Sequence, residues 1–159
     1  MKKRVVVTGL GIVSPLGLDS KANEEALFNG HSGVDFIKSF TPDNDFPVKI
    51  AGEVKGFDPK DYIDLKEIKK MDRFIHYAMA CSNMAMDESG LEINDSNAER
   101  VGVIIGVGLG GLPAIEKYHQ IYNEKGAKKI TPFFIPMLIA NLASGRCPFK
   151  RVLKGPILA

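Results

Sequence analysis

Two groups of residues in this sequence have types and spacings that suit chemistry. The first is a run of glycines directly after an apolar segment, made of Gly106, Gly108, Gly110 and Gly111. Glycine is placed where the backbone needs a positive φ or where another group must approach closely. The second group is basic and recurs at the helical spacing i, i+3, i+4, i+7, in Lys66, Lys69, Lys70 and Arg73. Like charges along one helix face suit either plain solvation or the docking of an acidic partner.

The other reactive residue types form no recognisable site. Cys81 and Cys147 lack a CxxC spacing, and no histidine is spaced to complete a metal site, so we expect no bound metal. We interpret both cysteines as reduced thiols of a cytoplasmic protein, and His76 as a structural or surface residue. The net charge of +2 is too small to indicate nucleic acid as a partner. No apolar run reaches the length of a membrane span, and Val5–Val7 is too short for a signal peptide.

The elements that must position these groups follow from the apolar pattern. With 159 residues, 45% of them hydrophobic and 25% charged, the chain has the composition of a globular domain. Val101–Val107 is a continuous apolar run, which predicts a strand buried on both faces. Pro113 suits the first position of a helix that continues to Lys125. The glycines therefore lie at the exit of a central strand, where α/β proteins place their sites.

The N-terminal half offers one tempting motif. The residues from Arg4 to Gly11 predict a strand that runs into a glycine turn. A dinucleotide fingerprint is disfavoured there, because its third glycine is missing and Pro15 occupies the start of the expected helix. We therefore predict a buried N-terminal strand with a tight exit. Asp19 or Ser20 can cap a helix that ends at Gly30.

Further elements are predicted by periodicity and composition. The helix ending at Gly30 is expected to turn Ala22, Ala26 and Leu27 inward. Residues 33–59 read as an excursion with hairpin character around a short strand at 48–52. Leu65–Ser89 predicts one long helix whose apolar arc comprises Ile68, Met71, Ile75, Ala78, Met79 and Ser82. A last helix is expected over Met137–Gly145.

Four stretches, taken in order, resemble one family. They are residues 4–17, the segment Lys70-Met71-Asp72-Arg73-Phe74, the glycine run 102–111, and residues 132–145. Together with Lys154-Gly155-Pro156 they resemble the β-ketoacyl-acyl-carrier-protein synthases of elongation type, most of all synthase II. The resemblance implies an α/β protein that holds the N-terminal part of a thiolase-like, layered α/β/α/β/α fold, with residues 1–159 forming part of one domain.

The resemblance also implies an activity, that of an acyltransferase of fatty acid biosynthesis. An acyl group passes from a carrier-protein thioester to a cysteine, and malonyl-carrier protein then loses carbon dioxide and attacks the acyl-enzyme. The nucleophilic cysteine is expected just beyond Ala159 and two histidines later still, so we expect the 159 residues alone to be inactive. The family implies no cofactor, a cytoplasmic homodimer, and acyl carrier protein with malonyl and acyl thioesters as partners.

Site residues are carried over position by position. Leu109 matches the residue that gates the acyl pocket, and Phe134 and Ile135 match residues that wall it, partly from the neighbouring subunit. From the residues alone, ordinary core packing would explain all three. Two basic groups match the docking surface for acyl carrier protein. The first is the group already noted, Lys66, Lys69, Lys70 and Arg73, and the second is the pair Lys128 and Lys129. Here the charge pattern and the resemblance agree.

The tail departs from the family pattern. After Gly145 relatives have an apolar strand, whereas residues 146–153 include a proline and three basic residues, which suit a buried strand badly. We therefore treat residues 146–159 as atypical. Two alternatives stay open: a non-catalytic homologue of the chain-length-factor kind, and a dinucleotide-binding domain.

Overall fold

The computed structural model describes residues 3–151 and 154–159. Its helices are α1 Ser20–Phe28, α2 Leu65–Ile68, α3 Arg73–Ser89, α4 Leu112–Lys125, α5 Phe134–Leu138 and α6 Leu142–Arg151. Shorter 3-10 helices are η1 Pro59–Asp61, η2 Ala98–Arg100 and η3 Ala127–Lys129. The strands are β1 Asp35–Phe36, β2 Ile50–Ala51, β3 Val103–Ile104 and β4 Ile157–Leu158.

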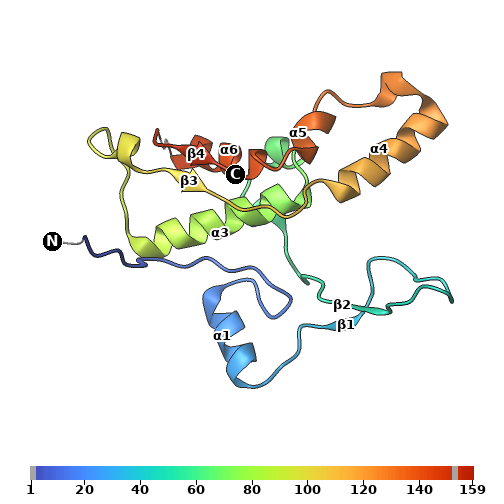
Figure 1. Cartoon of the computed structure of the whole chain (residues 1–159), viewed down its shortest axis with the longest axis horizontal. Helices are drawn as coiled ribbons and strands as arrows, with labels where there is room; N and C mark the ends of the chain where they lie inside the picture. The colour runs from blue at the N-terminus through green and yellow to red at the C-terminus, as the bar shows by residue number, and fades with distance from the viewer. Residues whose placement is uncertain (1–2, 152–153) are drawn as a thin grey trace.

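Helix α3 is the element around which the others are arranged (Figure 1). The N-terminal segment runs along one side of it, and β3, β4 and α6 lie on the other side. Gly9 and Gly11 permit this approach, because a Cβ on either would collide with the α3 backbone at Ala85 and Cys81. These glycines therefore serve helix packing, and the chain after them turns back through a Ser14–Gly17 bridge instead of opening a helix.

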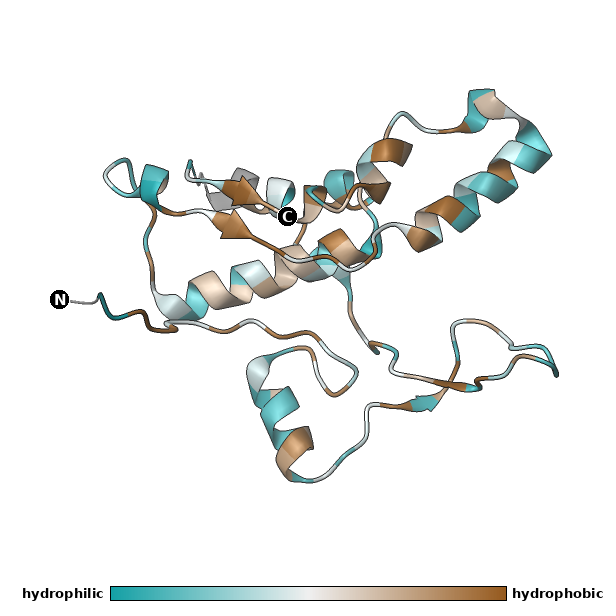
Figure 2. Ribbon diagram, in the orientation of Figure 1, coloured by the Kyte–Doolittle hydropathy of each residue, from teal (hydrophilic) through white to brown (hydrophobic). Residues whose placement is uncertain are grey.

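The N-terminal segment is extended, but the predicted buried strand is wrong. Residues 3–13 belong to no strand ladder in the described part of the chain. Val5 is 94% and Val7 78% exposed, and the apolar stretch is visible along this segment in Figure 2. The apolar residues are of the type that a sheet buries, but the segment contacts α3 through its glycines and leaves its valines uncovered.

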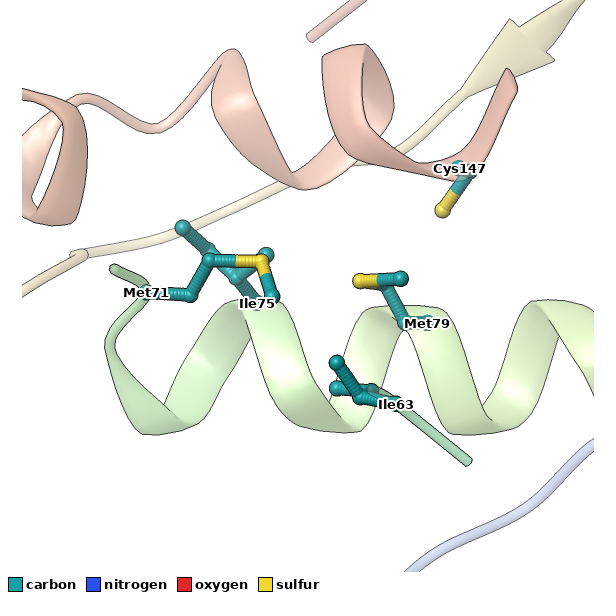
Figure 3. Close-up of a cluster of buried hydrophobic side chains, with 5 residues drawn as sticks. All are labelled: Ile63, Met71, Ile75, Met79 and Cys147. Atoms are coloured by element: carbon teal, nitrogen blue, oxygen red, sulfur yellow. The ribbon is translucent and has the colours of Figure 1, made fainter. Parts of the chain in front are cut away.

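The core lies between α3, α6 and the segment around Ile63 (Figure 3). Its buried members are Ile63, Met71, Ile75, Met79 and Cys147. Ile75 is fully buried, and Phe74, Val103 and Leu142 pack against the cluster. The predicted apolar arc is thus confirmed at Ile75 and Met79, which lie four positions apart on one face of α3, while Met71 is buried in the turn before the helix.

The continuous helix predicted over Leu65–Ser89 is wrong, because the chain forms two helices with a turn between them. Helix α2 ends at Ile68, and Asp72 has an extended backbone (φ −86°, ψ 167°) as the N-cap of α3. Aspartate is a poor residue inside a helix and a good one at its N-cap. The single basic helix face predicted for this stretch is therefore interrupted before Arg73.

Strands β3 and β4 form a parallel pair in which Val103 lies opposite Ile157. The prediction that Val101–Val107 is buried on both faces is wrong. Val103 packs on the core, but Ile104 is 76% exposed, because successive side chains of a strand point to opposite faces and the second face is uncovered here. Strand β4 was not predicted from the sequence. The absence of a side chain at Gly155 permits its close approach to β3, because a Cβ there would collide with the Val101 carbonyl.

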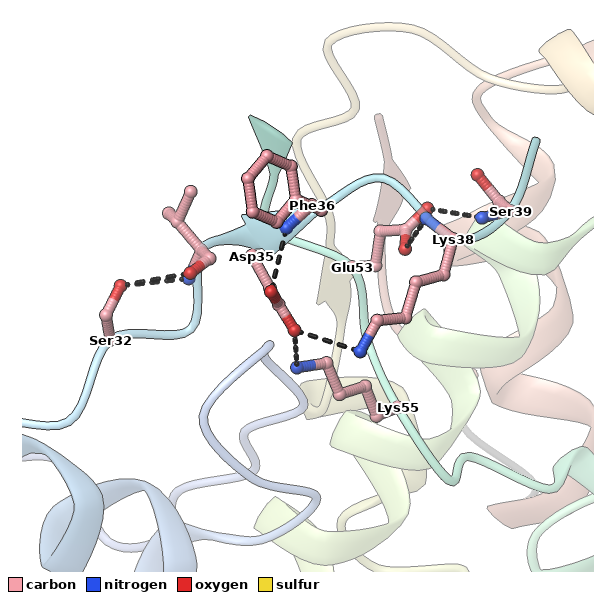
Figure 4. A network of polar contacts seen from close by, with 8 residues as sticks. Ser32, Asp35, Phe36, Lys38, Ser39, Glu53 and Lys55 are labelled. Carbon is pink, nitrogen blue, oxygen red and sulfur yellow. Dashed lines mark hydrogen bonds and ion pairs between the residues drawn. The ribbon is translucent and has the colours of Figure 1, made fainter. Parts of the chain in front are cut away.

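Residues 33–59 contain the predicted hairpin, in which β1 and β2 pair antiparallel with Asp35 opposite Ala51. Polar side chains support it (Figure 4). The Asp35 carboxylate lies 3.0 Å from the Lys38 ammonium and 3.3 Å from that of Lys55. The hydrogen bond from Lys38 is the main reason that the pKa of Asp35 is lowered to about 2. Glu53 accepts the backbone N–H groups of Lys38 and Ser39.

Helix α1 begins as predicted, because the Asp19 side chain accepts the N–H of Ala22 at 2.7 Å. Its predicted inward face is only partly correct. Ala26 is buried, whereas Leu27 is 67% exposed and Ala22 is half-buried. The inward position is taken by Asn23, whose side-chain amide donates to the carbonyls of Gly17 and Asp19.

The C-terminal half also divides differently from the prediction. Helix α4 covers the predicted range from Pro113 to Lys125. The helix predicted over Met137–Gly145 is interrupted, since α5 ends at Leu138 and α6 begins at Leu142. Helix α6 continues to Arg151, through much of the atypical tail, and residues 152 and 153 of that tail lie outside the described residues.

The molecule exposes more surface than a compact protein of its size. Its accessible area is 11506 Å² at a mass of 17.4 kDa, whereas a compact monomer of that mass exposes about 7,900 Å². Apolar side chains account for part of the excess, including Val5, Ile104 and Leu158. Within the described ranges, no helix has both the length and the apolar character needed to cross a membrane.

Candidate functional site

The glycine loop, residues 106–111, connects β3 to α4 and is fixed at one end only. A Cβ at Gly110 would lie 2.9 Å from the Phe74 ring and 3.0 Å from the Leu138 carbonyl oxygen. Gly111 has a φ of +70°, and a Cβ there would lie 2.7 Å from the Leu138 Cα. Among the described residues, chain neighbours apart, nothing lies within 4 Å of a Cβ placed at Gly106 or Gly108. The end next to α4 is therefore tightly packed, whereas the end next to β3 has room to move.

A buried carboxylate holds the start of α4. The Oδ2 atom of Asp72 accepts the backbone N–H of Ala114 at 3.0 Å. Asp72 is 8% and Ala114 5% exposed. The first N–H groups of a helix lack intrahelical partners, and a negative charge at that end is favourable. Although Asp72 is the N-cap of α3, its side chain makes no capping bond to α3, so the carboxylate serves α4 instead.

Of the three predicted pocket residues, Leu109 lies on this loop, and Phe134 and Ile135 lie on α5, whose end packs against the loop. Leu109 is 70% exposed on the glycine loop. Phe134 opens α5 and packs against Tyr118 of α4, with ring centroids 5.1 Å apart, while Ile135 is 58% exposed. The end of α5 lies on Gly110 and Gly111 through Leu138. Helix α5 thus links the two predicted pocket walls to the loop that carries Leu109.

A hollow of about 330 Å³ lies between the α2–α3 turn and helices α4 and α5. Its lining comprises Ile68, Lys69, Met71, Asp72, Arg73, Pro113, Ala114, Lys117, Tyr118 and Met137. None of the three predicted pocket residues lines it. The cationic side chains of Lys69, Arg73 and Lys117 give the open hollow a positive field. The Asp72 carboxylate at the same hollow accepts the N–H of Ala114.

The basic segment, residues 66–73, carries the first group of predicted docking residues. Lys66 lies on α2, Lys69 and Lys70 in the turn after it, and Arg73 at the start of α3. Lys66, Lys69 and Arg73 are exposed, whereas Lys70 is half-buried and paired with Glu67. The hydrogen bond from Lys70 lowers the pKa of Glu67, which also pairs with Arg146 at 3.1 Å.

The second predicted docking pair, Lys128 and Lys129, is exposed on η3. The Lys70 ammonium lies 5.5 Å from the centroid of the Phe133 ring. Phe133 follows Lys129 by four residues, a reach of at most about 14 Å for an extended chain. The structure therefore brings the basic segment beside the stretch that leads out of η3.

The reactive residue types form no catalytic cluster within residues 3–151 and 154–159. Burial raises the pKa of both Cys81 and Cys147, which opposes the thiolate form that a nucleophile needs. His76 is buried, and its Nε2 atom lies 3.1 Å from the Ile68 carbonyl oxygen, so the structural interpretation is confirmed. Over the same residues, no grouping of three or more His, Cys, Asp or Glu side chains could hold a metal ion.

Sequence reasoning missed Asp72 and Phe74, although both belong to a motif that it had singled out. One signal was available: an aspartate in the middle of a helical pattern indicates a helix start more often than a helix interior. The contact between Phe74 and Gly110 carries no such signal, because 36 positions separate the two residues and only the tertiary fold joins them.

The fold is that of the ketosynthases, within the thiolase-like α/β class. A solved structure described as a type II PKS acyl-carrier protein in complex with its ketosynthase bound to the hexaketide superposes with a TM-score of 0.78 at 25% identity. The match covers 96% of this chain and 41% of that one.

The chain belongs to the β-ketoacyl synthase family, because the family description "Beta-ketoacyl synthase, N-terminal domain" matches residues 2–159. A 3-oxoacyl-[acyl-carrier-protein] synthase 2 of Coxiella burnetii is 51% identical over 98% of the chain. The enzyme of the same name from Vibrio cholerae is 46% identical over 99%. The chain spans 37% and 38% of the length of these two relatives.

Proposed function

We propose that this chain is the N-terminal part of a 3-oxoacyl-acyl-carrier-protein synthase, an acyltransferase that extends acyl chains in fatty acid biosynthesis. The observation that carries the proposal is the 51% identity, over 98% of the chain, to a relative of that name. The reaction is the decarboxylative condensation of an acyl thioester with malonyl-acyl-carrier protein. Burial raises the pKa of both Cys81 and Cys147 and so disfavours their thiolates, and we expect neither of them to be its nucleophile.

In this proposal the chain contributes substrate recognition. Leu109 gates the acyl pocket, and its position on a loop with open space around Gly106 and Gly108 supports a side chain that can swing. Phe134 and Ile135 wall the pocket, and the exposure of Ile135 leaves it available to a neighbouring subunit of a homodimer.

The acidic acyl carrier protein docks on two basic groups of the chain. They are Lys66, Lys69, Lys70 and Arg73 of the basic segment and the pair Lys128 and Lys129. The contact between Lys70 and Phe133 supports a shared surface. A cytoplasmic location is part of the proposal, and free thiols at Cys81 and Cys147 agree with a reducing compartment.

The proposal is tested with the chain joined after Ala159 to the remaining part of the Coxiella burnetii relative, hereafter the joined enzyme. We expect it to form β-ketoacyl product from acyl- and malonyl-acyl-carrier protein. We also expect Cys81→Ala and Cys147→Ala to retain activity within about threefold, since loss of a nucleophile costs several orders of magnitude. A folded joined enzyme without condensing activity, or one inactivated by either substitution without unfolding, contradicts the proposal.

A further inference from the structure

The start of α3 holds a buried carboxylate that the proposed function does not use. We propose that Asp72 is a positioning residue that sets, from within the basic segment, the resting position of the acyl-pocket gate Leu109. The inference rests on the proposed function, because it gives Leu109 the role of a gate.

Asp72 contacts the start of α4 directly. The Asp72–Ala114 hydrogen bond joins two buried residues that lie 42 positions apart in the chain. A bond from an N–H to a carboxylate is stronger than one between neutral groups, and burial protects it from competition by water. The beginning of α4 is therefore fixed relative to the beginning of α3.

The start of α4 is connected to Leu109 through the glycine loop. Ala114 lies three residues after Gly111, which is pressed against Leu138, so this stretch cannot absorb a shift of the helix start. The first open positions toward β3 are Gly108 and Gly106, where no described residue other than the chain neighbours lies within 4 Å of an added Cβ. A displacement of α4 therefore reaches Leu109, which lies between the packed glycines and the open ones.

The Asp72 carboxylate belongs to the candidate site as well as to the core. Asp72 lines the same hollow as Lys69, Arg73, Pro113 and Ala114. In the described part of the chain every buried side-chain polar atom has a hydrogen-bond partner. Loss of the carboxylate would leave the Ala114 N–H buried without its partner, a situation that favours rearrangement of the helix start.

The test compares Asp72→Asn and Asp72→Ala in the joined enzyme. Asparagine keeps an acceptor oxygen but loses the charge, whereas alanine removes the acceptor, so the effects should be graded. The matched control is Asp64→Asn, the same change at the N-cap of α2, where the side chain makes no capping bond and the residue is exposed. Circular dichroism establishes that each variant is folded. If Asp72→Ala unfolds the protein, the comparison with wild type is made with Asp72→Asn.

Three quantities are measured: amide hydrogen exchange at Ala114, the ratio of kcat/KM for long and short acyl-carrier proteins, and KM for the carrier protein. We expect Ala114 to exchange roughly tenfold faster or more in Asp72→Ala, and less so in Asp72→Asn. The ratio between acyl chains should shift by about fivefold or more, with KM for the carrier within twofold of wild type. Asp64→Asn should change none of the three.

Unchanged exchange at Ala114 would overturn the inference, as would faster exchange with an unchanged ratio between acyl chains, because Asp72 would then serve stability alone. The proposed function is checked separately by Leu109→Ala in the same assay. If that substitution also leaves the ratio unchanged, the gate itself is wrong and the inference fails with it. If Leu109→Ala shifts the ratio and Asp72→Asn and Asp72→Ala do not, only the positioning role is overturned.

Discussion

Near the start of α3, alternate residues contact three different elements. Asp72 accepts the N–H of Ala114 on α4, Phe74 lies where a Cβ on Gly110 would have to go, and His76 bonds the Ile68 carbonyl at the end of α2. A short segment thereby fixes the glycine loop, the basic segment and α4 relative to one another. The residues that shape the site are thus different from those that the family resemblance assigns to substrate.

His76 should make the stability of this region depend on pH. Burial lowers the pKa of His76, against the raising effects of the Ile68 carbonyl and the Asp72 charge. Because the folded chain then binds the proton less readily than the unfolded chain, neutral His76 contributes stability above about pH 6.5 that is lost as pH falls below that value. NMR titration should give a midpoint below about 6.5 for the imidazole resonance that His76→Gln removes. A midpoint above that value would contradict the assignment.

Leu109 should affect selectivity more than stability. The side chain is 70% exposed, so Leu109→Ala removes little packing. We expect the free energy that separates competing long and short acyl chains to change by about 1–3 kcal/mol in the joined enzyme, with a small effect on unfolding. The measurement is kcat/KM for each acyl-carrier protein beside a thermal melt. Equal relative rates with an altered melt would instead assign Leu109 to packing.

Among the elements, several local signals were read correctly, although the helix breaks at Asp72 and after Leu138 were missed, and long-range contacts were not foreseen. The Asp19 cap, the hairpin in residues 33–59 and the helix from Pro113 to Lys125 were all predicted, because capping residues and periodicity act over a few positions. Burial of Val101–Val107 on both faces was predicted wrongly, since it depends on what covers β3. The Asp72–Ala114 bond could not be predicted, because no sequence pattern links residues 42 positions apart.

The candidate site was predicted in the same uneven way. The glycine loop was placed correctly between β3 and α4, because a glycine run after an apolar segment is itself a local signal. Its packing was not foreseen, since the contacts of Gly110 and Gly111 come from α3 and α5. The basic segment was identified by charge, but the helix break at Asp72 changed how its charges are presented.

The packed end of the glycine loop gives a test at the scale of the element. Gly111→Ala and Gly90→Ala both place alanine at a positive φ, +70° and +62°, and so carry a similar backbone strain of about 1–2 kcal/mol. Of the two, Gly111 faces Leu138, whereas no described residue beyond the chain neighbours lies within 4 Å of a Cβ at Gly90. Denaturant unfolding of the joined enzyme should show Gly111→Ala to be about 1–3 kcal/mol more destabilising than its control. Equal losses would mean that α5 does not clamp the loop.

At the scale of the whole molecule, the exposed apolar side chains are spread over many elements, whereas the predicted docking residues are confined to two stretches. The exposed apolar side chains include Val5 of the N-terminal segment, Phe28 of α1, Phe36 of β1, Leu65 of α2 and Ile104 of β3. The predicted docking residues occupy the stretch from α2 to the start of α3, and η3. Apolar surface suits permanent burial, whereas exposed charge suits a partner that must arrive and leave, because rim charges act mainly on the rate of association.

The most direct test of the proposed function is therefore charge reversal on the basic segment of the joined enzyme. Lys66→Glu with Lys69→Glu is compared with Lys3→Glu with Lys21→Glu, an equal change in charge at exposed lysines of the N-terminal segment and α1. We expect the first pair to raise KM for acyl-carrier protein about tenfold or more at low salt, and less at high salt, since screening acts over about 8–10 Å. The control pair should stay within about twofold, and a small acyl thioester that needs no carrier should react at an unchanged rate with both. Equal effects of the two pairs on KM, or an equal loss with the small thioester, would contradict carrier docking at this surface.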